Sequence, residues 1–217
     1  MASRPESPPE TAYRRPRPGR VRAETEVRRS RFIAFAERAA TETDMRRILA
    51  EIRSAFPDAR HHCSASVIHV DGARPVERSS DDGEPAGTAG QPMLEVVRGA
   101  GLLDVVVVVV RYFGGVKLGT GGLVRAYQDA TRAGLDEVDV VTRVPADRWA
   151  LTVPHADAGR VEAGLREAVT VEDVGYGREA RIVFGVPAGE DPTGVVSRVT
   201  SGRWDPEFVG RGWEDRP

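Results

Sequence analysis

Residues 111–125 bring together the residue types that bind anionic groups. Arg111, Lys117 and Arg125 could supply positive charge, and the glycines between them leave the backbone bare enough to approach a ligand closely. A helix that starts near Thr120 would add free backbone N–H groups at its N-terminus, where anions are favoured. A phosphate group would satisfy all of these features together.

The glycines of this loop allow two interpretations. They could let the backbone contact phosphate or nucleic acid, with Tyr112 or Phe113 stacking on a base. Alternatively, they could only let a strand, a loop and a helix pack tightly. The spacing is that of neither a Walker A loop nor a G-x-G-x-x-G fingerprint. The glycines are Gly114, Gly115, Gly119, Gly121 and Gly122.

A second loop, SSDDGEPAGTAGQP at 79–92, is acidic. Asp81, Asp82 and Glu84 could hold a hard cation through oxygen ligands, although their spacing is not that of an EF-hand. They could instead form an acidic turn, or pair with Arg111 and its neighbours and so fix the two loops to each other. We favour these two interpretations over a cation site.

The segment ARHHC places His61, His62 and Cys63 next to one another. On a strand, His61 and Cys63 would share a face. A structural zinc site normally has four ligands, and only two further histidines remain in the chain, so no metal is expected here. A Cys-His nucleophile pair stays open beside the simpler interpretation as half-buried strand residues. The residues expected beside the glycine-rich loop are His61, His62, Asp81, Asp82, Glu84, Gly87 and Thr88.

Hydrophobic patterning predicts the elements that hold these loops. The valine run at 105–110 is typical of a strand buried on both faces, and it leads directly into the glycine-rich loop. Thr41, three residues before Asp44, predicts a capping box that opens a helix, which Pro57 ends. Further strands are predicted at 31–39, 61–70 and 138–144, and further helices at 93–101 and 120–138.

Composition divides the chain into an arm, two domains and a linker. Residues 1–22, rich in proline and arginine, are predicted to be a disordered arm. Residues 23–142 are predicted to form an N-terminal α/β (α+β) domain, followed by a linker at 143–148. Residues 149–217 show the β-α-β-β-α-β order of a small ferredoxin-like domain, with one strand indistinct.

The overall composition argues against several classes of protein. A net charge of −2 over 217 residues gives no global attraction to nucleic acid. No apolar run reaches the length of a membrane-spanning helix, and the N-terminus lacks the apolar region of a secretory signal. The single cysteine cannot form an internal disulfide. We therefore expect a cytoplasmic protein with no membrane partner, no cofactor and no bound metal.

Four ordered motifs resemble the YigZ/IMPACT family, over roughly residues 23–142. They are SRFIA (30–34), ARHHC (59–63), SDDGEPAGTAGQP (80–92) and VVVVVVRYFGGVKLGTGGLVRAY (105–127). The remainder resembles, more weakly, the smaller C-terminal domain of bacterial YigZ-type members. The resemblance implies an N-terminal domain with the ribosomal protein S5 domain 2-like fold and a ferredoxin-like C-terminal domain.

The resemblance also implies a link to translation. Eukaryotic members are linked to regulation of translation initiation through a partner that activates an initiation-factor kinase, and they bind it with an extra N-terminal domain. Residues 1–22 are too short for that domain, so this role is not expected to transfer directly. The first hypothesis is an RNA- or ribosome-associated binding protein. The alternatives are a metal-assisted enzyme on a small phosphorylated substrate and a protein-interaction module with structural glycines.

Overall fold

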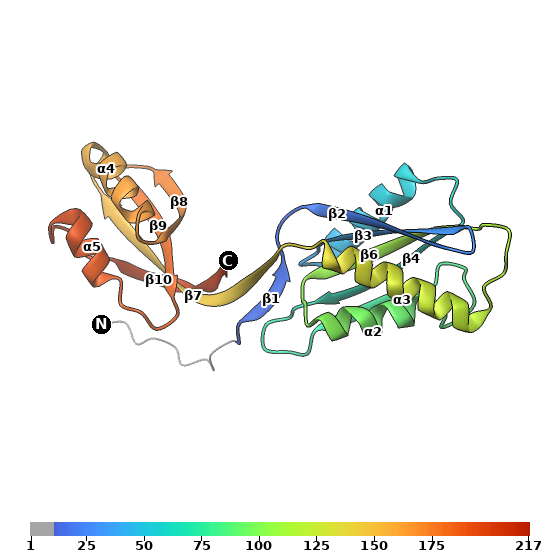
Figure 1. The fold of residues 1–217 in the computed structure, drawn as a ribbon. Helices are drawn as coiled ribbons and strands as arrows, with labels where there is room; N and C mark the ends of the chain where they lie inside the picture. The colour runs from blue at the N-terminus through green and yellow to red at the C-terminus, as the bar shows by residue number, and fades with distance from the viewer. Residues whose placement is uncertain (1–10) are drawn as a thin grey trace. The chain divides into compact units, whose positions relative to one another are not determined.

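The computed structural model describes residues 11–217, which form two α/β units (Figure 1). Tyr13–Thr142 form one unit, here called the N-terminal unit, and Arg143–Arg216 form the C-terminal unit. Among the described residues, no helix is both long and apolar enough to cross a membrane.

The N-terminal unit is built on a five-stranded sheet in the order β2-β3-β6-β4-β5, in which all neighbours are antiparallel. Its strands are β2 (Arg20–Val27), β3 (Ser30–Arg38), β4 (His61–Ile68), β5 (Val76–Ser80) and β6 (Val105–Tyr112). Its helices are α1 (Glu42–Ala55), α2 (Gly90–Ala100) and α3 (Thr120–Asp136).

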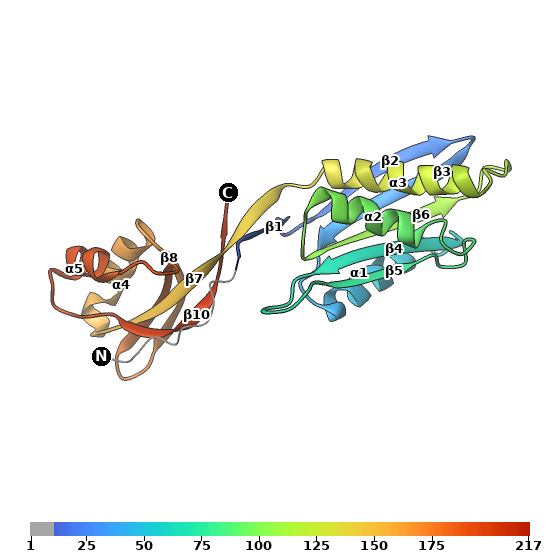
Figure 2. The same ribbon diagram turned by 90° about the horizontal axis from the view of Figure 1, so that it is seen from below.

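The central strand β6 separates two hydrophobic cores. Val105, Val107 and Val109 pack with residues of α2 and α3, whereas Val106 and Val108 pack with residues of α1 on the opposite face. Side chains alternate between the two faces of a strand, so a run of valines buries both. Figures 1 and 2 show α1 on one face and α2 and α3 on the other. The predicted doubly buried strand is confirmed.

Helix α1 begins as the sequence predicts. The backbone N–H of Asp44 donates to Thr41 Oγ1 at 3.0 Å, and the Asp44 carboxylate accepts from the backbone N–H of Thr41 at 3.0 Å. This reciprocal pair is a capping box. Ile48 and Ile52 of this helix are buried against the sheet.

The predicted disordered arm is wrong where it overlaps β1 (Tyr13–Pro16) and β2; residues 1–10 lie outside the described part of the chain. Tyr13 Oη and Arg15 Nη1 donate to Oδ2 of the buried Asp104 at 2.8 and 3.1 Å. A Pro/Arg-rich composition suggests solvation, but these contacts and the backbone hydrogen bonds Leu103 N–H to Arg14 O and Arg17 N–H to Asp139 O, at 2.9 and 2.8 Å, hold the segment in place.

The C-terminal unit follows the predicted β-α-β-β-α-β order. Its elements are β7 (Val140–Val153), which belongs to this unit from Arg143 on, α4 (His155–Arg166), β8 (Thr170–Tyr176), β9 (Ala180–Pro187), α5 (Thr193–Thr200) and β10 (Glu207–Arg216). β7 pairs with β9, β9 pairs with β8, and β10 also pairs with β7. Residues of α4 and α5 pack together with inward-facing residues of β7, β8 and β9. The predicted linker at 143–148 is not a loop, because these residues continue β7.

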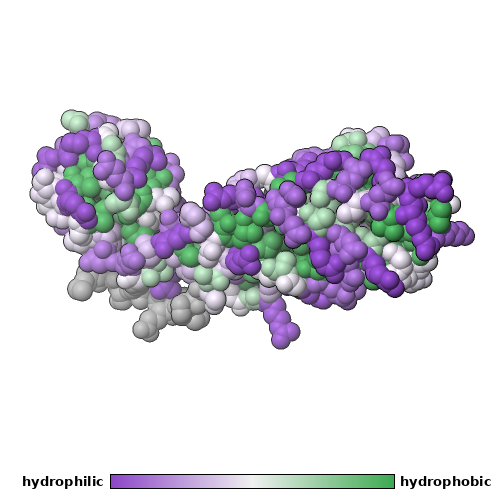
Figure 3. Space-filling view, in the orientation of Figure 1, coloured by the Kyte–Doolittle hydropathy of each residue, from purple (hydrophilic) through white to green (hydrophobic). Residues whose placement is uncertain are grey.

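The surface mixes polar and apolar residues. On the face seen in Figure 3, hydrophilic residues are spread over both units, and patches of hydrophobic residues show among them. Scattered apolar residues are ordinary on a folded surface. Surface hydropathy therefore does not locate a functional site. The site has to be located from local geometry and charge.

Candidate functional site

The glycine-rich loop and the acidic loop meet at a hollow of about 820 Å³, here called the N-terminal hollow. It lies where β6 ends and α3 begins. The predicted site residues that line it are His61, Glu84, Arg111, Tyr112, Phe113, Lys117, Gly119 and Thr120. The lining residues that the sequence did not single out are Asp58, Arg60, Pro85, Leu118 and Leu123.

Strand pairing explains part of this convergence. His61 at the start of β4 lies opposite Arg111 at the end of β6, and Ser64 of β4 lies opposite Ser80 at the end of β5. The glycine-rich loop after β6 and the acidic loop after β5 therefore leave the sheet at the same end. Arg60 directly precedes His61, and its place at the hollow could have been inferred from an assumed β4–β6 pairing. Nothing in the sequence pointed to Asp58, whose carboxylate accepts from the Tyr112 hydroxyl at 2.9 Å.

A buried ion pair joins the two loops. Arg111 Nη1 lies 2.6 Å from Glu84 Oε1, and the side chains are only 8% and 3% exposed. Tyr127 of α3 donates its hydroxyl proton to the same Glu84 oxygen at 2.7 Å. Glu84 thus holds Arg111 and α3 in place, as one of the two favoured interpretations of the acidic loop expects. Arg111 Nε is buried and has no hydrogen-bond acceptor among the described residues.

Cys63 lies behind this pair, inside the core. Its Sγ is 3.3 Å from the Tyr127 hydroxyl and 3.0 Å from the carbonyl oxygen of Asp81. Burial raises the pKa of the Cys63 thiol to about 12, and burial likewise raises the pKa of Tyr127. The thiol is therefore protonated at neutral pH and shielded from solvent, which argues against the Cys-His nucleophile.

The other two acidic residues organise the loop itself. Asp81 accepts backbone N–H groups from Gly87, Ala89 and Gly90 at 2.9, 3.0 and 2.8 Å. Burial alone would raise the pKa of Asp81, but these three donors lower it overall. Asp82 pairs with Arg53. Within residues 11–217, no group of three His, Cys, Asp or Glu residues is arranged to hold a metal ion.

The remaining loop-associated residues also have internal partners. His61 Nδ1 lies 2.9 Å from the carbonyl oxygen of Asp82, and Thr88 Oγ1 donates to the carbonyl of Pro85 at 2.7 Å. His62 points away from the hollow, with Nε2 3.1 Å from the carbonyl oxygen of Phe56. Burial lowers the pKa of His62. These residues support the loops.

Four of the five glycines have an architectural reason. A Cβ on Gly114 would lie 2.0 Å from the carbonyl carbon of Arg29. Gly115 and Gly119 have φ angles of +85° and +72°, which L-residues rarely adopt. A Cβ on Gly122 would lie 3.1 Å from Leu118 Cβ, whereas Gly121 has no atom within 4 Å of that position. Gly121 is the glycine of this loop that packing does not explain.

Positive charge without a partner remains at the start of α3. The helix begins after Gly119, which provides no side-chain cap, so its first N–H groups stay available for an anion. Lys117 and Arg60 are exposed beside it. Within the part of the chain that the structure describes, neither forms an ion pair. Arg125 is exposed on α3 but does not line the hollow.

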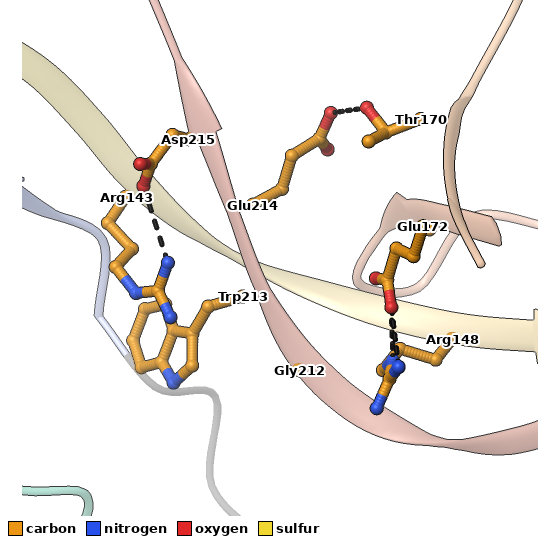
Figure 4. Close-up of a pocket in the computed structure, with 9 residues that line it drawn as sticks. Arg143, Arg148, Thr170, Glu172, Gly212, Trp213, Glu214 and Asp215 are labelled. Atoms are coloured by element: carbon orange, nitrogen blue, oxygen red, sulfur yellow. Dashed lines mark hydrogen bonds and ion pairs between the residues drawn. The ribbon is translucent and has the colours of Figure 1, made fainter. Parts of the chain in front are cut away.

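The C-terminal unit has a smaller hollow of about 430 Å³, here called the C-terminal hollow (Figure 4). Its charges are paired internally. Arg143 Nη1 lies 3.3 Å from Asp215 Oδ1, and Arg148 Nη2 lies 2.6 Å from Glu172 Oε2. The Glu214 carboxylate accepts from the hydroxyl of Thr170 at 2.5 Å. Both arginines that line this hollow thus have an acidic partner.

Comparison with known proteins places the chain in a family. The Impact N-terminal domain family matches residues 28–135, which include the whole N-terminal hollow. The IMPACT family member YvyE of Bacillus subtilis is 40% identical over 65% of this chain, and the match spans 64% of that relative, just under two thirds. An IMPACT family member of Haemophilus influenzae is 39% identical over 73% of this chain and 77% of its own length.

A solved structure resembles nearly the whole chain. It is described as the crystal structure of a hypothetical protein, is 30% identical, and covers 91% of this chain and 97% of its own, with a TM-score of 0.64. The structural likeness thus covers nearly the whole chain, and the family model covers most of the N-terminal unit. The chain belongs to the IMPACT family.

Proposed function

We propose that the protein binds RNA, on its own or within the ribosome, and acts in the regulation of translation in the cytoplasm. The N-terminal hollow would receive backbone phosphate. Lys117 and Arg60 would supply charge, and the first N–H groups of α3 would donate hydrogen bonds. The observation that carries this proposal is the pair of exposed cations, without a carboxylate partner among the described residues, set beside an uncapped helix N-terminus.

The near-neutral net charge is compatible with this proposal because the relevant charge is local. The hollow is lined by three cations and two carboxylates, and the Glu84 carboxylate is already neutralised by Arg111. What remains is a positive excess around the start of α3. Charges elsewhere on the protein are screened within about 10 Å at ordinary salt. The attraction of a phosphate close to the hollow therefore depends on this local excess.

The geometry favours binding over the metal-assisted enzyme. That alternative assigned Asp81, Asp82 or Glu84 to a divalent cation. Asp81 accepts three backbone N–H groups, Asp82 pairs with Arg53, and Glu84 holds Arg111 and Tyr127. A cation would have to displace these contacts, which stabilise the loop around the hollow.

The proposal includes the finer fold assignments. For the C-terminal unit, the pairing of β10 with β7, of β7 with β9 and of β9 with β8, together with the β-α-β-β-α-β sequence of elements, supports a ferredoxin-like fold. For the N-terminal unit, the family resemblance supports the ribosomal protein S5 domain 2-like fold. Because one scaffold hosts many activities, these folds add little to the functional argument.

A salt series tests the proposal. Binding of an unstructured single-stranded RNA octamer would be measured by fluorescence anisotropy at several salt concentrations. If Lys117 and Arg60 each neutralise one phosphate, log K falls with log salt at a slope of about −1.4, and Lys117→Gln removes about 0.7 of that slope. Arg148→Gln, in the C-terminal hollow, is the matched control and leaves the slope unchanged.

Two results would contradict the proposal. One is the absence of octamer binding at low salt. The other is binding that Lys117→Gln leaves unchanged, which would favour the protein-interaction module.

A further inference from the structure

Arg111 differs from the other two cations of the N-terminal hollow. Its side chain is 8% exposed and its charge is paired with Glu84 at 2.6 Å, whereas Lys117 and Arg60 are exposed. A buried pair that is neutral as a whole adds little to the attraction of phosphate, because a ligand meets both charges together. The phosphate contact expected of Arg111 from the sequence therefore needs another interpretation.

The aromatic rings around Arg111 indicate a different role for this residue. The guanidinium carbon lies 5.4 Å from the centroid of Phe32 and 5.8 Å from that of Phe113. Phe32 is fully buried, while Phe113 is 58% exposed. The guanidinium of Arg111 thus lies within cation–π distance of both a ring in the core and a ring at the surface.

Phe113 is unusual among the exposed residues. Three large hydrophobic side chains are exposed in the described part of the chain, namely Phe113, Tyr176 and Val209. Tyr176 stacks on His155 with ring centroids 5.9 Å apart. Phe113 lines the hollow together with Lys117 and Arg60. The buried guanidinium of Arg111 lies next to the Phe113 ring.

We infer that Phe113 is a stacking platform for an unpaired nucleic-acid base and that Arg111 is the positioning residue that holds it. This inference rests on the proposed function and narrows it. The ligand is a single strand that carries bases. A duplex keeps its bases stacked on one another, and a phosphate chain without bases offers Phe113 nothing to stack on.

Three ligands separate these cases: an unstructured RNA octamer, the same octamer annealed to its complement, and a ribose-phosphate chain of equal length without bases. The wild-type protein is expected to bind the single-stranded octamer about tenfold more tightly than either of the others. Phe113→Leu should abolish this preference and leave the salt slope unchanged. Because Phe113 is exposed, this variant should retain the fold.

The double variant Arg111→Gln with Glu84→Gln tests the role of Arg111. It removes both charges together, and the amide oxygen introduced by Glu84→Gln still accepts from the Tyr127 hydroxyl. A positioning residue predicts that the preference for bases falls several-fold while the salt slope stays constant. A phosphate contact predicts instead that the slope falls by about 0.7.

The results separate a failure of the stacking inference from a failure of the proposed function. Equal affinity for the octamer and the base-free chain, with binding still weakened by Lys117→Gln, overturns the inference and leaves the proposed function standing. A reduced slope in the double variant overturns the role of Arg111. The absence of binding to all three ligands overturns both. If the double variant does not fold, as judged by circular dichroism, Phe113→Leu alone decides on the platform.

Discussion

The two hollows contain the same kinds of charged residue and use them differently. In the C-terminal hollow, Arg148 and Glu172 form a pair whose side chains are 43% and 26% exposed, and Arg143 is paired as well. In the N-terminal hollow, the Arg111–Glu84 pair is buried, and two further cations have no acidic partner in residues 11–217. An arginine near a cavity therefore points to a ligand only when its charge is not already neutralised by the protein.

The largest expected contrast between the two hollows is in stability. Glu84→Ala leaves the buried Arg111 charge unpaired and should lower the free energy of unfolding by about 3–5 kcal/mol. Glu172→Ala breaks an exposed pair and should cost at most about 1 kcal/mol. Urea denaturation followed by far-UV circular dichroism measures both. Similar losses for the two variants would mean that burial does not distinguish the pairs.

Two glycines of the glycine-rich loop separate a role in packing from a role in binding. Gly114→Ala places a methyl group 2.0 Å from the backbone of Arg29 and should destabilise the fold by about 2–3 kcal/mol. Gly121→Ala meets no atom within 4 Å and should stabilise α3 by up to about 1 kcal/mol. Thermal unfolding measures whether each variant is less or more stable than the wild type. A destabilised Gly121→Ala variant would show that packing, not ligand approach, requires that glycine.

The sequence predicted the structural features that depend on residues close together in the chain, and it predicted long-range contacts less well. The valine run of β6 and the capping box of α1 were predictable, because both follow from residues close together in the chain. That Glu84 neutralises the charge of Arg111 was predicted only as one of three alternatives, beside an acidic turn and a cation site, since the pairing joins residues 27 positions apart. The structured segment at Tyr13–Pro16 was missed because its anchor, Asp104, lies far along the chain.

A smaller effect concerns pH and the acidic loop. The pKa of Asp81 is lowered in the folded protein, so its contribution to stability is complete above the ordinary carboxyl pKa, about 4, and is lost as the pH falls through the folded value. Asp81→Asn should cost about 1 kcal/mol at pH 7, and its difference from the wild type should narrow below about pH 4. A difference that stays constant down to pH 3 would contradict the role of the carboxylate.

The most direct test of the account is to map where RNA binds. Hydrogen–deuterium exchange of the full chain would be compared with and without an unstructured single-stranded RNA octamer at low salt. We expect slower exchange in residues 111–123, at the end of β6 and the first turn of α3, and unchanged exchange around Arg148 and Gly212. Protection confined to the C-terminal hollow, or no protection in either unit, would mean that the exposed cations of the N-terminal hollow do not bind RNA.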